Sequence, residues 1–496
     1  MLIKNKIVKG FTIAAACFSI VSCQKLKEFG DTNVNPNGAT TVNTAALLTN
    51  IQANLGGNNS STVGGVYCQY FAEATYPGTS LYSIPNFSSA GLYSGMLEDC
   101  QKIINYNSDP ATAGVAAGNG DNGNQIYIAK IIKNYIFWTM TDKWGDIPYS
   151  EALQGATVLS PKYDAQLSIY QGMIADLTAA ATGLNPNGGT IKGDVIFNGA
   201  IAKWQKLANS LRMLMAIRLS ERYPAATDYA AVEFAKAYGQ SAGYIATNAD
   251  NFYVVYPGGN IKNPYFGYNG LDNACSSTFT NILTGLSDTR VNVFTTDPAG
   301  VIYGLSSAAS TNNARIMNAT FRLENAPLFF VTASQVLLAQ AEAIELGWLT
   351  NLTTADAKVK YEAGITASFA QWGLAVPAGY LNSGTVDYNT GSGVAAIGSA
   401  VTVPGSSATT ATKLQRIYLQ EFIAFYPDGT QGWANWRRTD FPVLKPTVNA
   451  KNTSKQIVRR YQYAPYEYSL NGAQVAKASA AIGGDTQDNH VWWDKN

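Results

Sequence analysis

Residues 124–153 read NQIYIAKIIKNYIFWTMTDKWGDIPYSEAL, and this stretch decides the architecture of the chain. Over residues 124–142, isoleucine, tyrosine, phenylalanine and tryptophan fall on more than one face of a 3.6-residue period, which predicts a largely buried helix. Gly145 supplies a C-cap, and Pro148 blocks continuation of the helix. A chain organised around such a segment is expected to be mainly α-helical.

Three carboxylates close the stretch: Asp142, Asp146 and Glu151. An acid/base pair of the glycosidase type is one interpretation, because a turn can bring carboxylates within the necessary separation. The simpler interpretation is a helix terminus, in which Trp144 and Ile147 seat the turn on the core and Asp142 or Asp146 hydrogen-bonds loop backbone. We favour the second, which predicts that this stretch takes no part in ligand binding.

The same periodicity predicts further helices at residues 166–181, 199–222, 229–238, 329–347, 355–372 and 412–425, with Gly347 ending the helix over 329–347. Strand signals are few and short, at 252–256 and 401–403. Long loops are expected at 57–95, 251–275, 297–315 and 375–410, and loops of this length are usually functional. Residues 382–410, rich in Gly, Ser and Thr, are expected to form a surface insertion.

Composition narrows the class of function. Of 496 residues, 46% are apolar and 14% charged, with a net charge of +1 and one histidine, His490. Without a run of Lys and Arg, a nucleic-acid partner is not expected. A single imidazole removes most Ser–His–Asp catalysis and multi-histidine metal sites. We therefore expect no enzyme activity and no cofactor, and ligands that are neutral and form hydrogen bonds.

Short motif matches have structural explanations. Gly239–Gly243 fits GxSxG but follows a helix rather than a strand, so it is expected to end that helix. Gly118–Gly123 fits GxGxxG without a preceding strand, and is expected to lead into a helix N-cap at Asn122 or Asn124. The cysteines of the expected domain are Cys68, Cys100 and Cys275. Because they lack CxxC spacing, we expect small buried side chains and at most one disulfide.

The N-terminus has the features of an export signal. Three lysines precede the apolar residues 11–21, a stretch too short to span a bilayer, and Cys23 follows. We expect a lipoprotein signal peptide over 1–22, lipidation of Cys23 including palmitate, and a lipidated tether over 23–40. Soluble export with an incidental Cys23 is the alternative. The tether sequence DTNVNPN also fits a structural calcium site, although it lacks the full EF-hand register.

Aromatic residues in the long loops are the candidate ligand site. Aromatic faces stack on the apolar faces of sugar rings, while Asn and Asp bind hydroxyl groups. For each tyrosine, the alternative is a role in covering the helical core. The expected ligand-binding residues are Tyr76, Tyr82, Phe87, Tyr265, Phe266, Tyr268, Asn269, Asp272 and Tyr303.

Several stretches, in order, carry a family resemblance. They are Cys23 with DTNVNPN, WGDIPYSEAL at 144–153, KWQKLANSLRMLMAIR at 203–218, LTGLSDTRV at 283–291, PLFFVTASQVLLAQAEAIELGW at 327–348, YEAGITASFAQWG at 361–373, QRIYLQEFIAFYPDGTQGWANWRRTDFPVL at 415–444, RRYQYAPYEYSLN and the closing VWWDKN. Together they resemble the SusD/RagB-like nutrient-binding outer-membrane lipoproteins, in the SusD-like starch-binding-associated group. One departure is LSDTR, where the family commonly has Asp-Pro-Arg.

The resemblance implies a single domain over residues 41–496, built on four tetratricopeptide-like helix pairs with loops packed around them. It implies a lipid-anchored protein at the cell surface of the outer membrane. Its function would be to capture a nutrient, in many members a glycan, for a SusC-like TonB-dependent transporter. Two alternatives stay open: a secreted hydrolase that uses carboxylates such as Asp142 and Asp146, and a surface scaffold without a small ligand.

Overall fold

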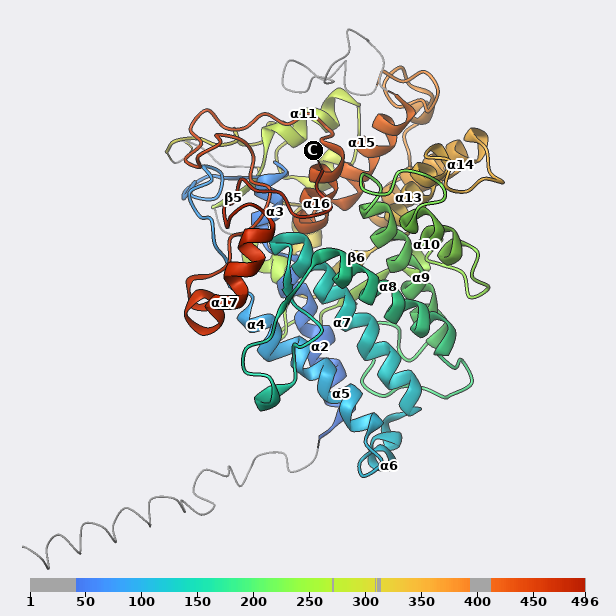
Figure 1. The fold of residues 1–496 in the computed structure, drawn as a ribbon. Helices are drawn as coiled ribbons and strands as arrows, with labels where there is room; N and C mark the ends of the chain where they lie inside the picture. Colours follow the sequence, from blue (N-terminus) through green and yellow to red (C-terminus); the bar gives the residue numbers. More distant parts are fainter. Residues whose placement is uncertain (1–41, 270–271, 308, 310–313, 393–411, 496) are drawn as a thin grey trace, which may run out of the picture. The chain divides into compact units, whose positions relative to one another are not determined.

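The computed structural model describes residues 42–269, 272–307, 309, 314–392 and 412–495 (Figure 1). Residues Thr44–Asn496 form one compact unit. The signal peptide expected over 1–22, Cys23, the tether expected over 23–40, the strand expected at 401–403 and most of the insertion expected at 382–410 lie outside the described residues.

Helices dominate the unit, and successive helices pack as pairs. α5 packs on α7, α8 on α9 and α13 on α14, so Figure 1 shows a series of neighbouring helices from α5 to α14. This arrangement confirms the mainly α, tetratricopeptide-like fold. The helices are α2 (Thr44–Asn59), α3 (Thr62–Tyr67), α4 (Ala90–Leu92), α5 (Glu98–Ser108), α6 (Ala113–Ala116), α7 (Asn122–Trp144), α8 (Gln166–Gly183), α9 (Ile201–Arg218), α10 (Tyr229–Tyr238), α11 (Ser277–Gly285), α12 (Val291–Phe294), α13 (Ala333–Glu345), α14 (Thr354–Gln371), α15 (Lys413–Phe425), α16 (Gly429–Thr439) and α17 (Pro465–Ala481). Within the described ranges, no helix has the length and apolar character needed to cross a membrane.

Three two-stranded antiparallel sheets accompany the helices. They pair β1 (Phe71–Glu73) with β5 (Asn273–Cys275), β2 (Ile147–Pro148) with β3 (Tyr163–Asp164), and β4 (Phe252–Val255) with β6 (Pro327–Val331). β4 was predicted, but β6 occupies the start of the helix predicted over 329–347. The helix begins only at Ala333, because Thr332 and Gln335 form a reciprocal capping box at that point.

α7, the helix of the opening stretch, is buried along most of its length, as predicted. It ends at Gly145, whose φ is 83° and whose N–H donates to the Thr141 carbonyl at 2.8 Å. Its N-cap is neither Asn122 nor Asn124. Instead Asp121 accepts a hydrogen bond from the Asn124 N–H at 2.8 Å. The carboxylate at the positive end of the helix explains this choice, since it interacts favourably with the helix dipole.

Cys68, Cys100 and Cys275 are free and buried, as the lack of spacing indicated. Gly239 follows the last residue of α10, which confirms that the GxSxG match is a helix end.

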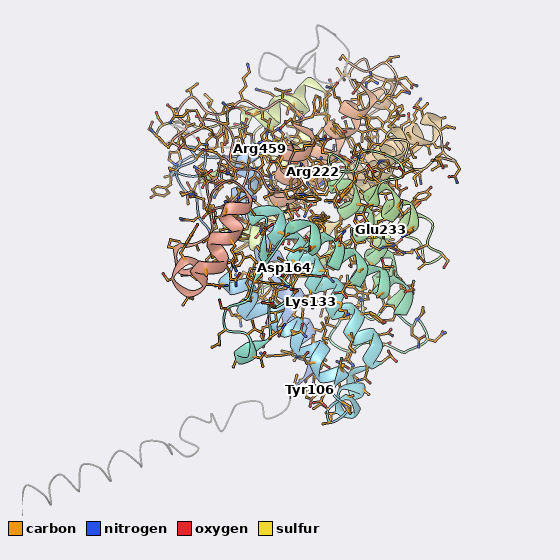
Figure 2. The ribbon with its side chains drawn as sticks, viewed as in Figure 1. Tyr106, Lys133, Asp164, Arg222, Glu233 and Arg459 are labelled. Carbon is orange, nitrogen blue, oxygen red and sulfur yellow. The ribbon has the colours of Figure 1, made fainter. Side chains whose placement is uncertain are left out.

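The C-terminal segment completes the core around α7. Asp142 is fully buried and accepts a hydrogen bond from the Trp493 indole N–H at 2.8 Å. The Arg218 guanidinium lies 3.5 Å from the same carboxylate. The neighbouring arginines labelled in Figure 2 hold this end of the chain: Arg222 donates to the Trp492 carbonyl at 2.6 Å, and Arg459 lies 3.3 Å from Asp494. Val491, Trp493 and Asp494 are therefore part of the core.

Candidate ligand-binding site

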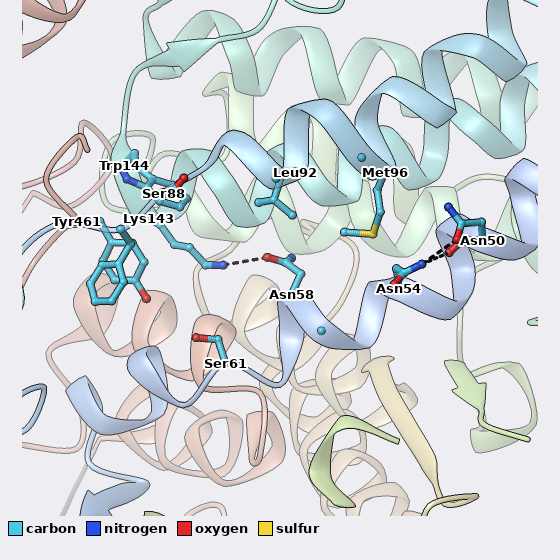
Figure 3. A pocket seen from close by; sticks show the side chains of 14 residues that line it. Asn50, Asn54, Asn58, Ser61, Ser88, Leu92, Met96, Lys143, Trp144 and Tyr461 are labelled. Atoms are coloured by element: carbon cyan, nitrogen blue, oxygen red, sulfur yellow. Dashed lines mark hydrogen bonds between the residues drawn. The ribbon is translucent and has the colours of Figure 1, made fainter. Parts of the chain in front are cut away.

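A cavity of about 620 Å³ opens between α2, the α4 region, the end of α7 and the C-terminal segment (Figure 3). Its lining combines aromatic rings with amide and hydroxyl groups, which is the composition expected of a site for amphipathic, hydroxyl-rich ligands. The lining residues are Asn50, Asn54, Gly57, Asn58, Ser61, Phe87, Ser88, Gly91, Leu92, Gly95, Met96, Lys143, Trp144 and Tyr461.

The aromatic wall consists of Phe87, Tyr461 and Trp144. The ring centroids of Phe87 and Tyr461 lie 4.2 Å apart, and those of Trp144 and Tyr461 lie 5.2 Å apart with the planes nearly perpendicular. The Tyr461 N–H donates to the Lys143 carbonyl at 2.8 Å, which fixes this wall to the end of α7. Of the three rings only Phe87 is half-buried, so it offers the accessible face.

The polar wall is the outer face of α2. Asn50, Asn54 and Asn58 are spaced at i, i+4 and i+8, so they align along one side of the helix. The Asn54 amide donates to the Asn50 side-chain oxygen at 3.0 Å, and the Asn58 amide donates to the Thr139 hydroxyl at 2.9 Å. These bonds hold the amides in place, and among the described residues no donor binds Oδ1 of Asn54, which can therefore accept from a ligand.

Lys143, in the last turn of α7, brings the positive charge to the cavity. Its side chain is 5% exposed, and its ammonium donates to Asn58 Oδ1 at 3.2 Å (Figure 3). Burial lowers the pKa of Lys143 from 10.5 to about 8, while the nearby carboxylates of Asp428 and Asp142 oppose that shift. Near neutral pH the group is therefore mostly protonated.

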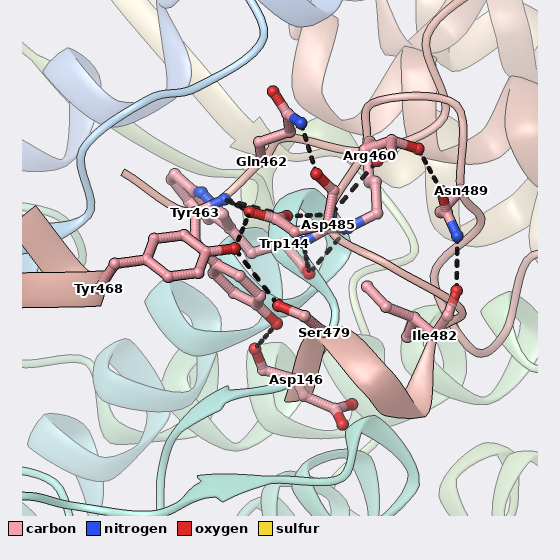
Figure 4. Close-up of polar contacts among 11 residues, drawn as sticks. Trp144, Asp146, Arg460, Gln462, Tyr463, Tyr468, Ser479, Ile482, Asp485 and Asn489 are labelled. Carbon is pink, nitrogen blue, oxygen red and sulfur yellow. Dashed lines mark hydrogen bonds and ion pairs between the residues drawn. The ribbon is translucent and has the colours of Figure 1, made fainter. Parts of the chain in front are cut away.

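The wall behind Trp144 is held by a polar network (Figure 4). The Trp144 carbonyl accepts from both the Nε and Nη2 of Arg460, at 3.3 and 3.1 Å. Arg460 also pairs with Asp485, and Tyr463 donates its hydroxyl proton to the Asp146 carbonyl at 2.7 Å. Since both residues beside Gly145 are anchored through their backbone, the turn after α7 is a rigid support for the cavity.

Of the residues predicted from the loops, only Phe87 lies in this cavity. Tyr82 and Tyr303 lie together elsewhere, with their hydroxyl oxygens 3.4 Å apart, and Tyr82 is fully buried. Burial raises the pKa of Tyr82 to about 12. Tyr265 is also buried, and its ring contacts Tyr268, with centroids 5.8 Å apart.

Tyr268 donates to the Ser60 carbonyl at 2.8 Å, which ties its loop to the residues between α2 and α3. Tyr76 and Phe266 are exposed, and the Lys262 ammonium lies 4.7 Å from the Phe266 ring centroid. Asp272 accepts a hydrogen bond from the Tyr76 N–H at 3.0 Å, so it joins two of the long loops. The side chain of Asn269 lies outside the described part.

The three carboxylates of the opening stretch point to separate partners. Asp142 binds Trp493 and faces Arg218, Asp146 accepts from the Gln166 N–H at 2.8 Å, and Glu151 accepts from the Lys162 N–H at 2.9 Å. Asp146 thus binds loop-end backbone as expected, whereas Asp142 binds side chains. None of them lines the cavity in Figure 3. Across the described ranges, no cluster of three His, Cys, Asp or Glu side chains is positioned to hold a metal ion.

Two residues of the opening stretch nevertheless border the cavity: Lys143 and Trp144. This differs from the expectation that the stretch stands apart from any candidate ligand site. The sequence did contain a signal for the opposite wall, because asparagine at 50, 54 and 58 is unusual on a helix face meant only for solvent. That signal was missed because residues 44–59 were not predicted to be helical.

Comparison with known proteins agrees with this architecture. A family model described as SusD-like, "Starch-binding associating with outer membrane", matches residues 36–464. Among proteins with curated descriptions, none matches significantly.

Solved structures align with almost the whole chain. One titled a chitin-binding protein is 26% identical, with a TM-score of 0.72, covering 92% of this chain and 100% of its own. A chitin-binding SusD homologue from Flavobacterium johnsoniae is 25% identical, with a TM-score of 0.70, covering 91% of this chain and 98% of its own. A SusD homologue from Bacteroides uniformis shares the fold at 24% identity, with a TM-score of 0.73 and coverage of 91% and 99%. The chain belongs to the SusD-like family of outer-membrane-associated glycan-binding proteins.

Proposed function

We propose that this protein is a lipid-anchored, surface-exposed outer-membrane protein that binds an oligosaccharide in the cavity of Figure 3, without hydrolysing it, and delivers it to a SusC-like TonB-dependent transporter. The observation that carries the binding step is the cavity itself. Its volume is about 620 Å³, and its lining includes the half-buried ring of Phe87 and the amides of α2, so the faces and the hydroxyl groups of a sugar both meet partners. The two chitin-binding relatives make N-acetylglucosamine oligomers the first ligands to test.

The binding step is tested by titrating a panel of soluble oligosaccharides into residues 24–496. Replacing Phe87 by Ala removes the stacking face, so we expect about tenfold weaker binding by a chain that stays folded, with a lower melting temperature because the ring also packs on Tyr461. Tyr76→Ala and Phe266→Ala are matched controls, because these exposed rings lie on the loops and not in the cavity. Lower affinity in the controls but not in Phe87→Ala would move the site to the loops.

The positions of the acids support the proposal that the protein does not hydrolyse the glycan. Asp142, Asp146 and Glu151 each bind other groups of the protein and stay outside the cavity lining. We expect no reducing ends to be released from any glycan that binds. Release that disappears in Asp142→Asn or Asp146→Asn would establish the hydrolase instead.

Anchoring and delivery rest on the signal sequence and on the family. Labelled palmitate should enter the wild type and not Cys23→Ala, and a large outer-membrane barrel should co-purify from detergent extracts at native expression. A chain that carries no label and purifies alone would argue against the lipoprotein and against the transporter partner. Calcium binding by the tether stays a prediction, checked by titrating calcium into chains with and without residues 24–40.

A further inference from the structure

The charge of the cavity is more specific than the near-neutral composition of the chain suggests. Among the described residues that line it, Lys143 is the only one with a formally charged side chain. Its ammonium has three protons to donate, and among the described residues Asn58 is the only hydrogen-bond acceptor it reaches. A buried ammonium usually has a carboxylate partner, because an unpaired buried charge is costly.

The surrounding acids do not supply that partner. Asp142 faces Arg218 at 3.5 Å and accepts from Trp493, so its charge is already engaged. Asp428, which caps α16, accepts from the Asn59 amide at 2.9 Å and from the Gln431 N–H at 3.1 Å. Within the described residues, neither carboxylate lies within salt-bridge distance of Lys143, and neither lines the cavity.

We propose that Lys143 recognises a carboxylate carried by the bound sugar, so that the preferred ligand contains an acidic residue such as a uronic acid. The inference rests on the proposed oligosaccharide site and specifies its substrate class. The carboxylate would take the ammonium protons that Asn58 leaves unused. The hydroxyl of Ser61, which makes no capping hydrogen bond to α3, and Oδ1 of Asn54 would bind neighbouring sugar groups (Figure 3).

The decisive probe is a matched pair of ligands for the full mature chain in detergent. One is an oligosaccharide of alternating N-acetylglucosamine and glucuronic acid; the other is the same oligosaccharide with its carboxyl groups reduced to primary alcohols. At pH 7 and low salt we expect the acidic form to bind about tenfold more tightly. Lys143→Met should bring the affinity ratio close to one. Lys236→Met, at an exposed lysine on α10, removes the same charge and should leave the ratio unchanged.

The pH dependence of the affinity ratio in the wild type tests the same inference without a variant. The pKa of Lys143 is about 8, so the preference should be complete below pH 7 and lost as pH rises through 8 to 10. Of the other titratable groups nearby, the pKa of Asp428 is about 6 and burial raises that of Tyr461 far above 10, so neither changes charge in this window. Proton uptake on binding at pH 8.5 should accompany the acidic ligand only.

Equal affinity for both forms in the wild type, or a ratio that persists at pH 10, would overturn this inference and leave the oligosaccharide site intact. Binding of neither form, together with no binding of neutral oligosaccharides, would remove the proposed function and this inference with it.

Discussion

Asp146 illustrates how one carboxylate serves the fold. Its side chain is largely buried and accepts a hydrogen bond from the Gln166 N–H, the first residue of α8. Burial raises the pKa of Asp146, and the bond to Gln166 opposes that shift by stabilising the ionised form. The residue thus joins the end of α7 to the start of the next helix.

We predict that Asp146→Ala lowers the free energy of unfolding by about 1–2 kcal/mol, because the Gln166 N–H loses its acceptor. Affinity for the ligand should stay unchanged, since Asp146 does not line the cavity. Asp146→Asn keeps an acceptor oxygen and should recover most of the stability in chemical denaturation. Weaker binding with unchanged melting would assign Asp146 to the ligand site.

At the scale of elements, the contact between α3 and α16 depends on glycine. A Cβ at Gly429 would lie 2.1 Å from the Gly65 nitrogen, and one at Gly64 would lie 2.5 Å from the Gly429 carbonyl oxygen. The atoms that such a Cβ would meet belong to the backbone, so the clash cannot be relieved by a change of side-chain rotamer. The two helices therefore pack closely only because both surfaces lack side chains.

We predict that Gly429→Ala destabilises the protein by about 1–3 kcal/mol through overpacking. Gly57→Ala is the matched control, because a Cβ there meets nothing within 4 Å and alanine favours a helix interior by about 0.5–1 kcal/mol. Thermal melting should therefore fall for the first variant and rise for the second. A neutral Gly429→Ala would mean that α3 and α16 can separate at little cost.

The same elements show what sequence can and cannot predict. α7 and its end at Gly145 were predictable, because dense apolar spacing and a glycine–proline punctuation are local signals. α16, with the sequence GTQGWANWRRT, was not, since its glycines disfavour a helix until α3 supplies the close contact. Phe329–Val331 of β6 were assigned to a helix because no breaker separates them from the helical sequence that follows, and the pairing of β6 with β4 is a long-range contact.

The candidate site was only partly predictable, for a related reason. Loop aromatics such as Tyr82 and Tyr265 are equally suited to a ligand and to a core, and the structure buries both. Phe87 was identified by composition alone. Lys143 could not be identified from the sequence, because its proposed role depends on the lack of a carboxylate partner in the fold. The sequence alone does not show which side chains become neighbours.

At the scale of the whole molecule, the C-terminal residues close the core. Trp493 is fully buried and donates a hydrogen bond to Asp142 in the last turn of α7. Arg437 lies between the rings of Trp433 and Trp493, with its guanidinium 3.7 and 4.8 Å from their centroids. Removing the C-terminal segment would leave a cavity where Trp493 packs and would expose the buried carboxylate of Asp142.

We predict that a chain ending at Val491 loses cooperative unfolding, because losing a buried tryptophan costs about 3–5 kcal/mol and Asp142 also loses a donor. That sum is comparable with the total stability of many domains, about 5–15 kcal/mol. A chain ending at Asp494 keeps both tryptophans and should melt like the wild type. We expect the chain ending at Val491 to be digested faster by protease than the chain ending at Asp494. Equal resistance of the two chains would contradict the prediction.

The hydrogen bond between Asp142 and Trp493 can form only late in synthesis, because 351 positions separate the two residues in the sequence. At typical rates of translation, about 5–20 residues per second, the ribosome needs roughly 20–70 s to travel from one to the other. Throughout that interval α7 lacks the partner that completes its surroundings. For the export proposed above this delay is an advantage, since a chain that has not completed its core can still pass through a translocation channel.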